Sequence, residues 1–183
     1  MVSLKLFYYD DGSKAREVRD RKMSSVMVDL FPSTFTSYDA ISVLGEGHFG
    51  NVYLCKDKGT GALVATKRID HECFLSFKAQ RHSSLTIVSE ADMLKANTED
   101  GLLHCIEHVS TGNCELLVTE YCDGGTLFDH IISAGDEEVP DALHIATQLL
   151  QSVFHIHQRC VVHRDIKPGN VFCVLPHHDP RLF

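Results

Sequence analysis

Apolar and polar positions alternate with a period of two along several short segments, which is the pattern of half-buried β-strands. These segments cover residues 39–47, 50–56, 62–69, 102–109 and 114–121. A turn rich in glycine and charge separates the second from the third, and the sequence "STGN" separates the last two. The pattern therefore predicts an antiparallel meander followed by a further hairpin.

Apolar residues at spacings of three and four predict helices in three other segments. The first covers residues 83–97 and is expected to pack on the sheet, the second covers 126–134, and the third covers 140–158. Pro140 and Asp141 are typical of a helix start. The third helix carries an apolar stripe: Leu143, Ala146, Leu149, Leu150, Val153 and Phe154. Together the segments predict an α+β fold with a small antiparallel sheet.

Composition limits the class of protein. The formal net charge of -8 argues against a general nucleic-acid-binding protein, because the phosphate backbone would repel the average surface. No segment approaches the roughly 18 consecutive apolar residues of a membrane helix, so we expect no membrane span. The seven cysteines include no Cys-x-x-Cys pair, which favours free thiols and an intracellular, cytoplasmic or nuclear location.

The spacing of Gly45, Gly47 and Gly50 is G-x-G-x-x-G, which lets backbone amides approach a phosphate because no Cβ lies in the way. The same spacing fits a turn with a purely structural role. It also fits a dinucleotide-binding domain, in which Asp70 is placed to bind a ribose. That domain needs a helix directly after the third glycine, whereas residues 51–69 alternate and turn like a hairpin.

A lysine follows on the same predicted sheet. Lys67 lies two positions after Ala65, so both side chains lie on one face of the strand. Ala65 leaves room for a flat base while Lys67 reaches its phosphates, and Glu90 on the predicted helix offers the lysine a carboxylate partner. A solvated charge at a strand edge is the alternative interpretation of Lys67.

Five motifs occur in the order and nearly at the spacing of the protein kinases, so the chain resembles that family. They are "LGEGHFGNVYL", "VATK", the glutamate of "SEADML", "VTEYCDGGTLF" and "HRDIKPGN". The resemblance covers about Tyr38 to Val174, and Lys167, two positions after Asp165, is typical of the serine/threonine class. A surface loop with incidental charges is the alternative for residues 163–170.

The resemblance implies a division of the chain into an N-terminal extension (1–37), an ATP-binding sheet lobe (38–120) and a partial helical lobe (121–183). It implies ATP and Mg²⁺ as cofactors and a protein serine or threonine hydroxyl as substrate. The residues implied to contact the nucleotide are Gly45, Gly47, Gly50, Val52, Ala65, Lys67, Thr119, Glu120, Cys122 and Phe172. The residues implied in phosphoryl transfer are Lys67 paired with Glu90, Asp165 beside the substrate hydroxyl, Lys167 at the transferred group and Asn170 at magnesium.

The sequence departs from the family pattern after Asn170. Protein kinases carry a second magnesium-binding aspartate in an Asp-Phe-Gly turn about thirteen residues later, where this chain ends. Asp179, within "DPR", is the only acid there and does not resemble that turn. We therefore expect a chain truncated before this turn, with weak or absent turnover. We also expect an apolar stripe on helix 141–158 that a protein partner covers.

Two further functions remain open at this point. One is a non-catalytic kinase-like module that binds a nucleotide or a partner, and the other is a nucleotide-binding protein of another fold. Several histidines and cysteines gather between residues 155 and 178, but their spacing matches no standard metal site. We therefore expect structural or solvated roles for them.

Overall fold

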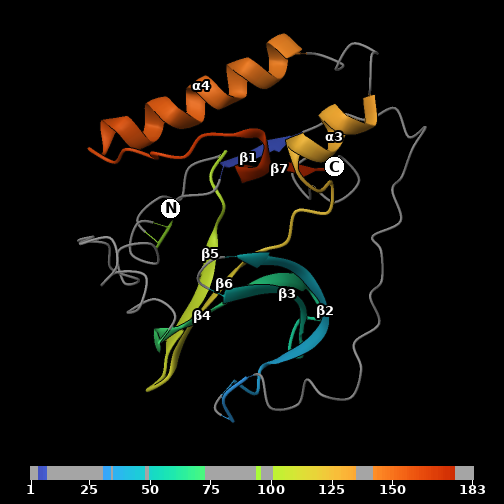
Figure 1. Cartoon of the computed structure of the whole chain (residues 1–183), viewed down its shortest axis with the longest axis vertical. Coiled ribbons are helices and arrows are strands. Elements are labelled where there is room, and N and C mark those ends of the chain that lie inside the picture. Colours follow the sequence, from blue (N-terminus) through green and yellow to red (C-terminus); the bar gives the residue numbers. More distant parts are fainter. Residues whose placement is uncertain are drawn as a thin grey trace. The chain divides into compact units, whose positions relative to one another are not determined.

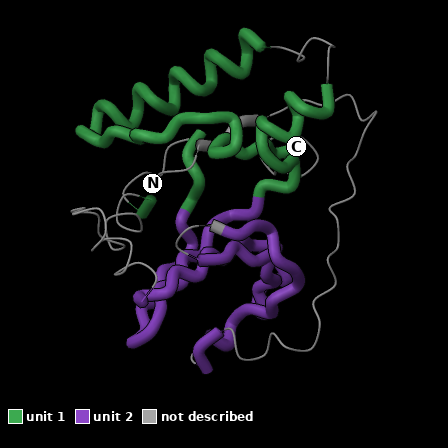
Figure 2. Tube along the Cα trace, in the orientation of Figure 1, with its two compact units in different colours: residues 1–15, 92–104, 122–183 green, residues 16–91, 105–121 purple. Residues whose placement is uncertain are grey.

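The computed structural model of the chain describes residues 4–7, 31–33, 35–47, 50–72, 94–95, 101–134 and 142–175. The chain divides into two compact units, shown in Figure 2. We call residues 16–91 and 105–121 the sheet unit, and residues 1–15, 92–104 and 122–183 the helical unit. Helices in the described residues are all too short or too polar to cross a membrane.

The sheet unit holds a five-stranded antiparallel sheet with the order β2-β3-β4-β6-β5 (Figure 1). Its strands are β2 (Tyr38–Gly47), β3 (Gly50–Asp57), β4 (Leu63–Asp70), β5 (Cys105–Ser110) and β6 (Cys114–Glu120). The predicted meander and hairpin are therefore confirmed. In the β3–β4 turn, Asp57 Oδ1 accepts the backbone N–H groups of Gly59 at 2.7 Å and Thr60 at 3.0 Å. Both hydrogen bonds lower the pKa of Asp57, and the bond from Thr60 has the larger effect.

One face of this sheet forms the core of the unit, and we call it the aromatic face. Its buried residues from the strands are Tyr38, Tyr53, Cys55, Val64, Cys114, Leu116 and Val118. Phe35 and Phe31 pack against them from the segment before β2, and Phe31 lies 5.1 Å from both Phe35 and Tyr53 between ring centroids. Residues before position 38 thus contribute to the core, which the sequence pattern did not predict.

The helical unit contains α3 (Leu127–Ala134), α4 (Ala142–Gln158), the short 3₁₀ helix η2 (Pro168–Asn170) and β7 (Val171–Val174). Thr126 and Asp129 cap α3 reciprocally, because Thr126 Oγ1 accepts the Asp129 N–H at 3.2 Å and Asp129 Oδ2 accepts the Thr126 N–H at 3.1 Å. Both predicted helices of this unit are confirmed. The α+β prediction, with an incomplete helical lobe, is also confirmed.

Helix α4 has one buried and one exposed apolar side. Ile145, Ser152 and Ile156 are buried, and Ser152 Oγ donates a hydrogen bond to the Gln148 carbonyl at 2.9 Å. The exposed side carries Leu143, Leu150 and Phe154, which are 80%, 71% and 57% exposed. These three belong to the apolar stripe identified in the sequence.

The first strand of the chain was not predicted. β1 (Leu4–Phe7) pairs in parallel with β7, with Leu4 opposite Val171 and Phe7 opposite Val174. Four residues carry too little pattern to predict a strand, and this one depends on a partner more than 160 positions away in the chain. The predicted helix 83–97 lies outside the described residues, except for Leu94 and Lys95.

The predicted domain boundaries at 37 and 120 remain a prediction. The compact units follow a different division, since residues 92–104 group with the helical unit and residues 31–37 with the sheet unit. Chain segments that are distant in sequence therefore build each unit.

Candidate functional site

The face opposite the aromatic face carries four of the predicted nucleotide contacts, and we call it the lysine face. Val52 lies opposite Lys67, and Ala65 lies opposite Thr119, across neighbouring strands. Residues opposite each other in an antiparallel pair project from the same side of the sheet, so the register brings these four side chains onto one surface. Val52, Ala65 and Lys67 are each partly exposed there.

The three glycines flank the turn between β2 and β3. Gly45 pairs with Val52 and Gly47 with Gly50. A Cβ atom built on Gly45 has no neighbour within 4 Å, so the space above it is open. A Cβ atom on Gly50 would lie 1.8 Å from the Arg68 carbonyl oxygen, and Gly50 has a φ of 144°. Gly50 is therefore required by the close approach of two strands, whereas Gly45 leaves room for a ligand.

The next predicted residues lie at the end of β6 and in the segment that follows it. The Thr119 hydroxyl donates to the Ala65 carbonyl at 3.4 Å and is buried, with 8% of the residue exposed. Glu120 pairs with Val64. Cys122 is buried and belongs to the helical unit.

The loop before η2 gathers three predicted residues around one carboxylate. Lys167 Nζ lies 2.9 Å from Asp165 Oδ2. Asn170 Nδ2 donates to the same oxygen at 2.8 Å and to the Asp165 main-chain carbonyl at 2.7 Å. The hydrogen bond from Lys167, followed by that from Asn170, lowers the pKa of Asp165. The carboxylate is thus ionised at neutral pH and held in position from two sides.

The backbone of this loop is held by a histidine and a left-handed residue. His163 is buried, and its Nδ1 accepts the Asp165 N–H at 3.2 Å. Arg164 lies between them with a φ of 67°, a conformation that residues other than glycine rarely adopt. The strained residue directly precedes Asp165, so the loop is shaped to present that carboxylate.

A glycine pair links the segment after β6 to β7 within the helical unit. Gly124 N–H donates to the Cys173 carbonyl at 3.0 Å, and Cys173 N–H donates to the Gly125 carbonyl at 2.8 Å. Asp123 Oδ1 accepts the Leu175 N–H at 3.1 Å. Phe172, which is predicted to lie below the adenine, forms an isolated antiparallel β-bridge with Thr126. A Cβ atom on Gly124 would lie 2.7 Å from the Cys173 carbonyl oxygen. The glycine pair lies within the motif "VTEYCDGGTLF", but the sequence did not predict that it pairs with β7.

The loop fits a magnesium ion only as part of a larger coordination sphere. Asn170 uses its amide nitrogen toward Asp165, so Oδ1 is the side-chain atom that can coordinate a cation. No cluster of three or more histidine, cysteine, aspartate or glutamate residues that could hold a metal occurs in the described part of the chain. Mg²⁺ typically takes one or two protein ligands together with nucleotide phosphates, and this donor set is compatible with that mode.

The predicted site residues therefore fall into two groups, one in each compact unit. Val52, Ala65, Lys67 and Thr119 share the lysine face, and Asp165, Lys167 and Asn170 share the loop. Glu90, the predicted partner of Lys67, lies outside the described residues. The remaining contact roles stay predictions.

Comparison with known proteins gives the family. Residues 38–183 match the protein kinase domain family. Serine/threonine-protein kinase cds1 of Schizosaccharomyces pombe is 30% identical over 150 residues, which are 82% of this chain and 33% of that protein. Calcium-dependent protein kinase 4 of Plasmodium berghei is 36% identical over 134 residues, which are 73% of this chain and 25% of that protein.

Calcium/calmodulin-dependent protein kinase type 1B of Rattus norvegicus is 32% identical over 146 residues, which are 79% of this chain and 40% of that protein. The chain thus spans between a quarter and two fifths of these three relatives. The family match covers most of the chain, and the relatives named above are protein kinases. The chain belongs to the eukaryotic-type protein kinase family, in its serine/threonine class.

Proposed function

We propose that this chain forms the ATP-binding part and the catalytic loop of an enzyme that transfers the γ-phosphoryl group of Mg-ATP to serine or threonine hydroxyls of proteins. The observation that carries the proposal is the loop around Asp165. Lys167 and Asn170 both contact its carboxylate, at 2.9 and 2.8 Å. A carboxylate held beside a cation and an amide suits the transfer of a group whose negative charge is spread over oxygens.

The lysine face is proposed as the nucleotide surface. Val52 and Ala65 offer a small apolar surface for the adenine, and Lys67 projects from the same side to hold the α- and β-phosphates. The backbone from Glu120 to Cys122 is proposed to bind the adenine edge, with Thr119 beside it and Phe172 on its other side. The open space above Gly45 supports phosphate binding by the Gly45, Gly47 and Gly50 segment.

The loop is proposed to act on the substrate hydroxyl. Asp165, ionised because of its lowered pKa, accepts a hydrogen bond from the hydroxyl and orients it for attack. Lys167 stabilises the negative charge of the transferred group. Asn170 holds a magnesium ion, whose role when bound is to neutralise charge on the phosphates.

The 183-residue chain on its own is proposed to turn over slowly or not at all. Its sequence contains no Asp-Phe-Gly motif to supply the second magnesium ligand of the family.

Calorimetry with Mg-ATP and the whole chain tests the proposal. We expect weak binding that Lys67→Met abolishes and that His157→Asn, a change on the exposed side of α4, leaves intact. Equal binding by Lys67→Met would overturn the proposed nucleotide surface. Transfer of radiolabelled phosphate to a protein substrate, if lost in Asp165→Asn, would instead show that this chain is catalytically competent.

A second candidate function is a non-catalytic module that binds a protein partner through α4. The exposure of Leu143, Leu150 and Phe154 favours it, because a row of exposed apolar side chains is typical of an interaction surface. Leu150→Glu and Phe154→Glu should then reduce association in light scattering without changing Mg-ATP binding, with Gln151→Glu as the exposed control. Unchanged association would count against this function.

An intracellular location is also proposed. The six cysteines in the described residues are all free thiols, and five of them are buried. Free thiols are typical of a reducing compartment.

A further inference from the structure

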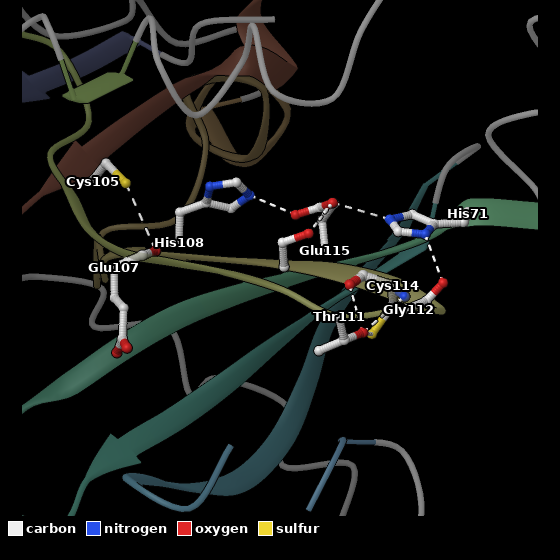
Figure 3. A network of polar contacts seen from close by, with 9 residues as sticks. His71, Cys105, Glu107, His108, Thr111, Gly112, Cys114 and Glu115 are labelled. Carbon is white, nitrogen blue, oxygen red and sulfur yellow. Dashed lines mark hydrogen bonds and ion pairs between the residues drawn. The ribbon is translucent and has the colours of Figure 1, made fainter. Parts of the chain in front are cut away.

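A buried carboxylate with three polar partners lies on the lysine face, away from the proposed nucleotide contacts. Glu115 of β6 is 5% exposed. Its Oε1 accepts from Ser110 Oγ at 2.8 Å and lies 3.0 Å from His71 Nε2, and its Oε2 lies 2.7 Å from His108 Nε2. We call these four residues the Glu115 cluster, and Figure 3 shows it in detail.

His71 has an acceptor at each ring nitrogen. Nε2 faces the Glu115 carboxylate, and Nδ1 lies 3.2 Å from the Gly112 carbonyl oxygen (Figure 3). A carbonyl and an ionised carboxylate can only accept, so each contact is a hydrogen bond only if the nitrogen carries a proton. A neutral imidazole has one N–H, and therefore only the doubly protonated, positively charged ring satisfies both contacts.

The cluster adds contacts just beyond the last pair of the β4–β6 ladder, where Asp70 lies opposite Cys114. His71 directly follows β4, and its backbone N–H donates to the Asn113 carbonyl at 3.0 Å. Its ring contacts Gly112 in the same turn and Glu115 at the start of β6. Three hydrogen bonds from one residue thus attach the end of β4 to the β5–β6 hairpin, and two of them depend on the protonation of the ring.

The position of the cluster relates it to Lys67. Lys67 pairs with Leu117 in the β4–β6 register, and Ile69 pairs with Glu115 two positions further along. All four side chains project from the lysine face because strand side chains repeat with a period of two. The cluster therefore lies at the C-terminal end of β4, beginning two positions beyond Lys67.

We propose that the Glu115 cluster is a proton-dependent link, in which a positively charged His71 adds two ring contacts between the end of β4 and the β5–β6 hairpin, and loss of one His71 proton removes one of them. The inference rests on contacts within the sheet unit alone and does not depend on the proposed kinase activity.

The surrounding charges are consistent with a cation at His71. Burial acts to raise the pKa of Glu115, but the hydrogen bonds from Ser110, His71 and His108 outweigh it and the pKa is lowered, so the carboxylate is ionised at neutral pH. His108 faces Glu115 from β5, and Glu72, which follows His71, is exposed.

The remaining nearby charges belong to β4. Arg68 and Asp70 form their own ion pair at 2.6 Å, and they alternate with Ile69 to the opposite face of the strand. Among the described residues, Glu115 is thus the carboxylate that the His71 ring contacts, and His71 and His108 are the two described side chains that can bring a positive charge to it.

The expected dependence on pH has a defined sign at each end. The link needs both His71 ring protons, so its contribution to stability is lost as the pH rises and the ring gives up one of them. It also needs the Glu115 carboxylate, whose pKa is lowered, so the contribution is present above the ordinary glutamate pKa and is lost as the pH falls through the lowered value.

Nuclear magnetic resonance of the ring nitrogens in the whole chain tests the charge directly. At pH 6 we expect protons on both Nδ1 and Nε2 of His71, and at pH 8 a proton on one of them together with faster hydrogen exchange of the His71 amide. A folded chain in which His71 carries a single ring proton at pH 6 would overturn the proposal, and this measurement needs no variant.

Thermal unfolding tests the coupling to Glu115. The melting temperature should be higher at pH 6 than at pH 8. Glu115→Gln should remove most of this difference, because a neutral amide stabilises a charged imidazole less than a carboxylate does. His157→Asn on α4 serves as the matched histidine control and should preserve the difference. A pH difference that Glu115→Gln leaves unchanged would also overturn the proposal.

Discussion

Replacing Gly50 with alanine is expected to destabilise the sheet unit strongly. The added Cβ would lie 1.8 Å from the Arg68 carbonyl oxygen and 2.9 Å from its carbonyl carbon. Both are backbone atoms, so β3 or β4 has to move. The φ of 144° adds a second cost, because residues with a side chain rarely adopt it.

The magnitude follows from these two effects. A non-glycine residue in a disfavoured backbone region costs about 1–3 kcal/mol. Forcing an extra carbon into a packed position costs typically about another 1–3 kcal/mol. We therefore expect Gly50→Ala to lower the free energy of unfolding by about 2–6 kcal/mol, a large part of the roughly 5–15 kcal/mol that holds a typical domain folded.

Gly45 provides the matched control in the same glycine motif. A Cβ atom placed on Gly45 would have no neighbour within 4 Å, and Gly45 does not occur among the glycines with positive φ. Gly45→Ala should therefore change the free energy of unfolding by less than about 1 kcal/mol. Under the proposed function it should still weaken Mg-ATP binding, because the methyl group enters the space left for a phosphate.

Denaturant unfolding followed by circular dichroism, with calorimetry for Mg-ATP, separates the two roles. Gly50→Ala should shift the unfolding midpoint, and Gly45→Ala should shift the affinity. If the two variants unfold at the same denaturant concentration, the close approach of Gly50 to β4 does not constrain the strand, and the structural argument for this glycine is wrong.

Three other outcomes follow from the structure. Lys167→Met should raise the pKa of Asp165 toward its ordinary value, because it removes the largest cause of the lowered pKa, and carbon-detected titration of the carboxyl measures this. At pH 8, Cys160 should react with a maleimide much faster than Cys173, because Cys160 is exposed whereas burial raises the pKa of Cys173 to about 12. Peptide mapping measures the two rates separately, and equal rates would contradict the burial of Cys173. Leu6→Pro should speed hydrogen exchange in β7, because proline removes a backbone donor from β1 opposite Cys173, while exchange in β6 serves as the unaffected reference.

The sequence was sufficient to predict elements whose pattern is local. The alternation in β3 and β4 and the apolar spacing in α4 are properties of consecutive residues, so their existence and type followed directly. The loop around Asp165 is also local, because the three residues that meet lie within six positions of one another, but their roles came from the resemblance and stay predictions.

The features that the sequence did not predict depend on contacts between distant segments. β1 is a strand because of β7, and Phe31 enters the core because Tyr53 lies beside it. The Glu115 cluster gave no signal either, since His71 and Glu115 are 44 positions apart and neither belongs to a recognisable motif. Pairing between distant strands, which the alternation does not determine, decides β1 and the Glu115 cluster, and packing onto the sheet decides Phe31.

The locality of the Asp165 loop has a consequence for how the proposed site is built. Asn170 Nδ2 contacts both the side chain and the backbone carbonyl of Asp165, and His163 accepts the Asp165 N–H, so the carboxylate is positioned by neighbours in its own loop. Residues so close in sequence close only short loops, which cost little entropy. The β7 strand that follows is in turn attached to Gly124 and Gly125 by two backbone hydrogen bonds. The helical unit therefore contains in itself the contacts that orient Asp165, and a loss of substrate or metal binding by this chain would not imply that the loop has lost its geometry.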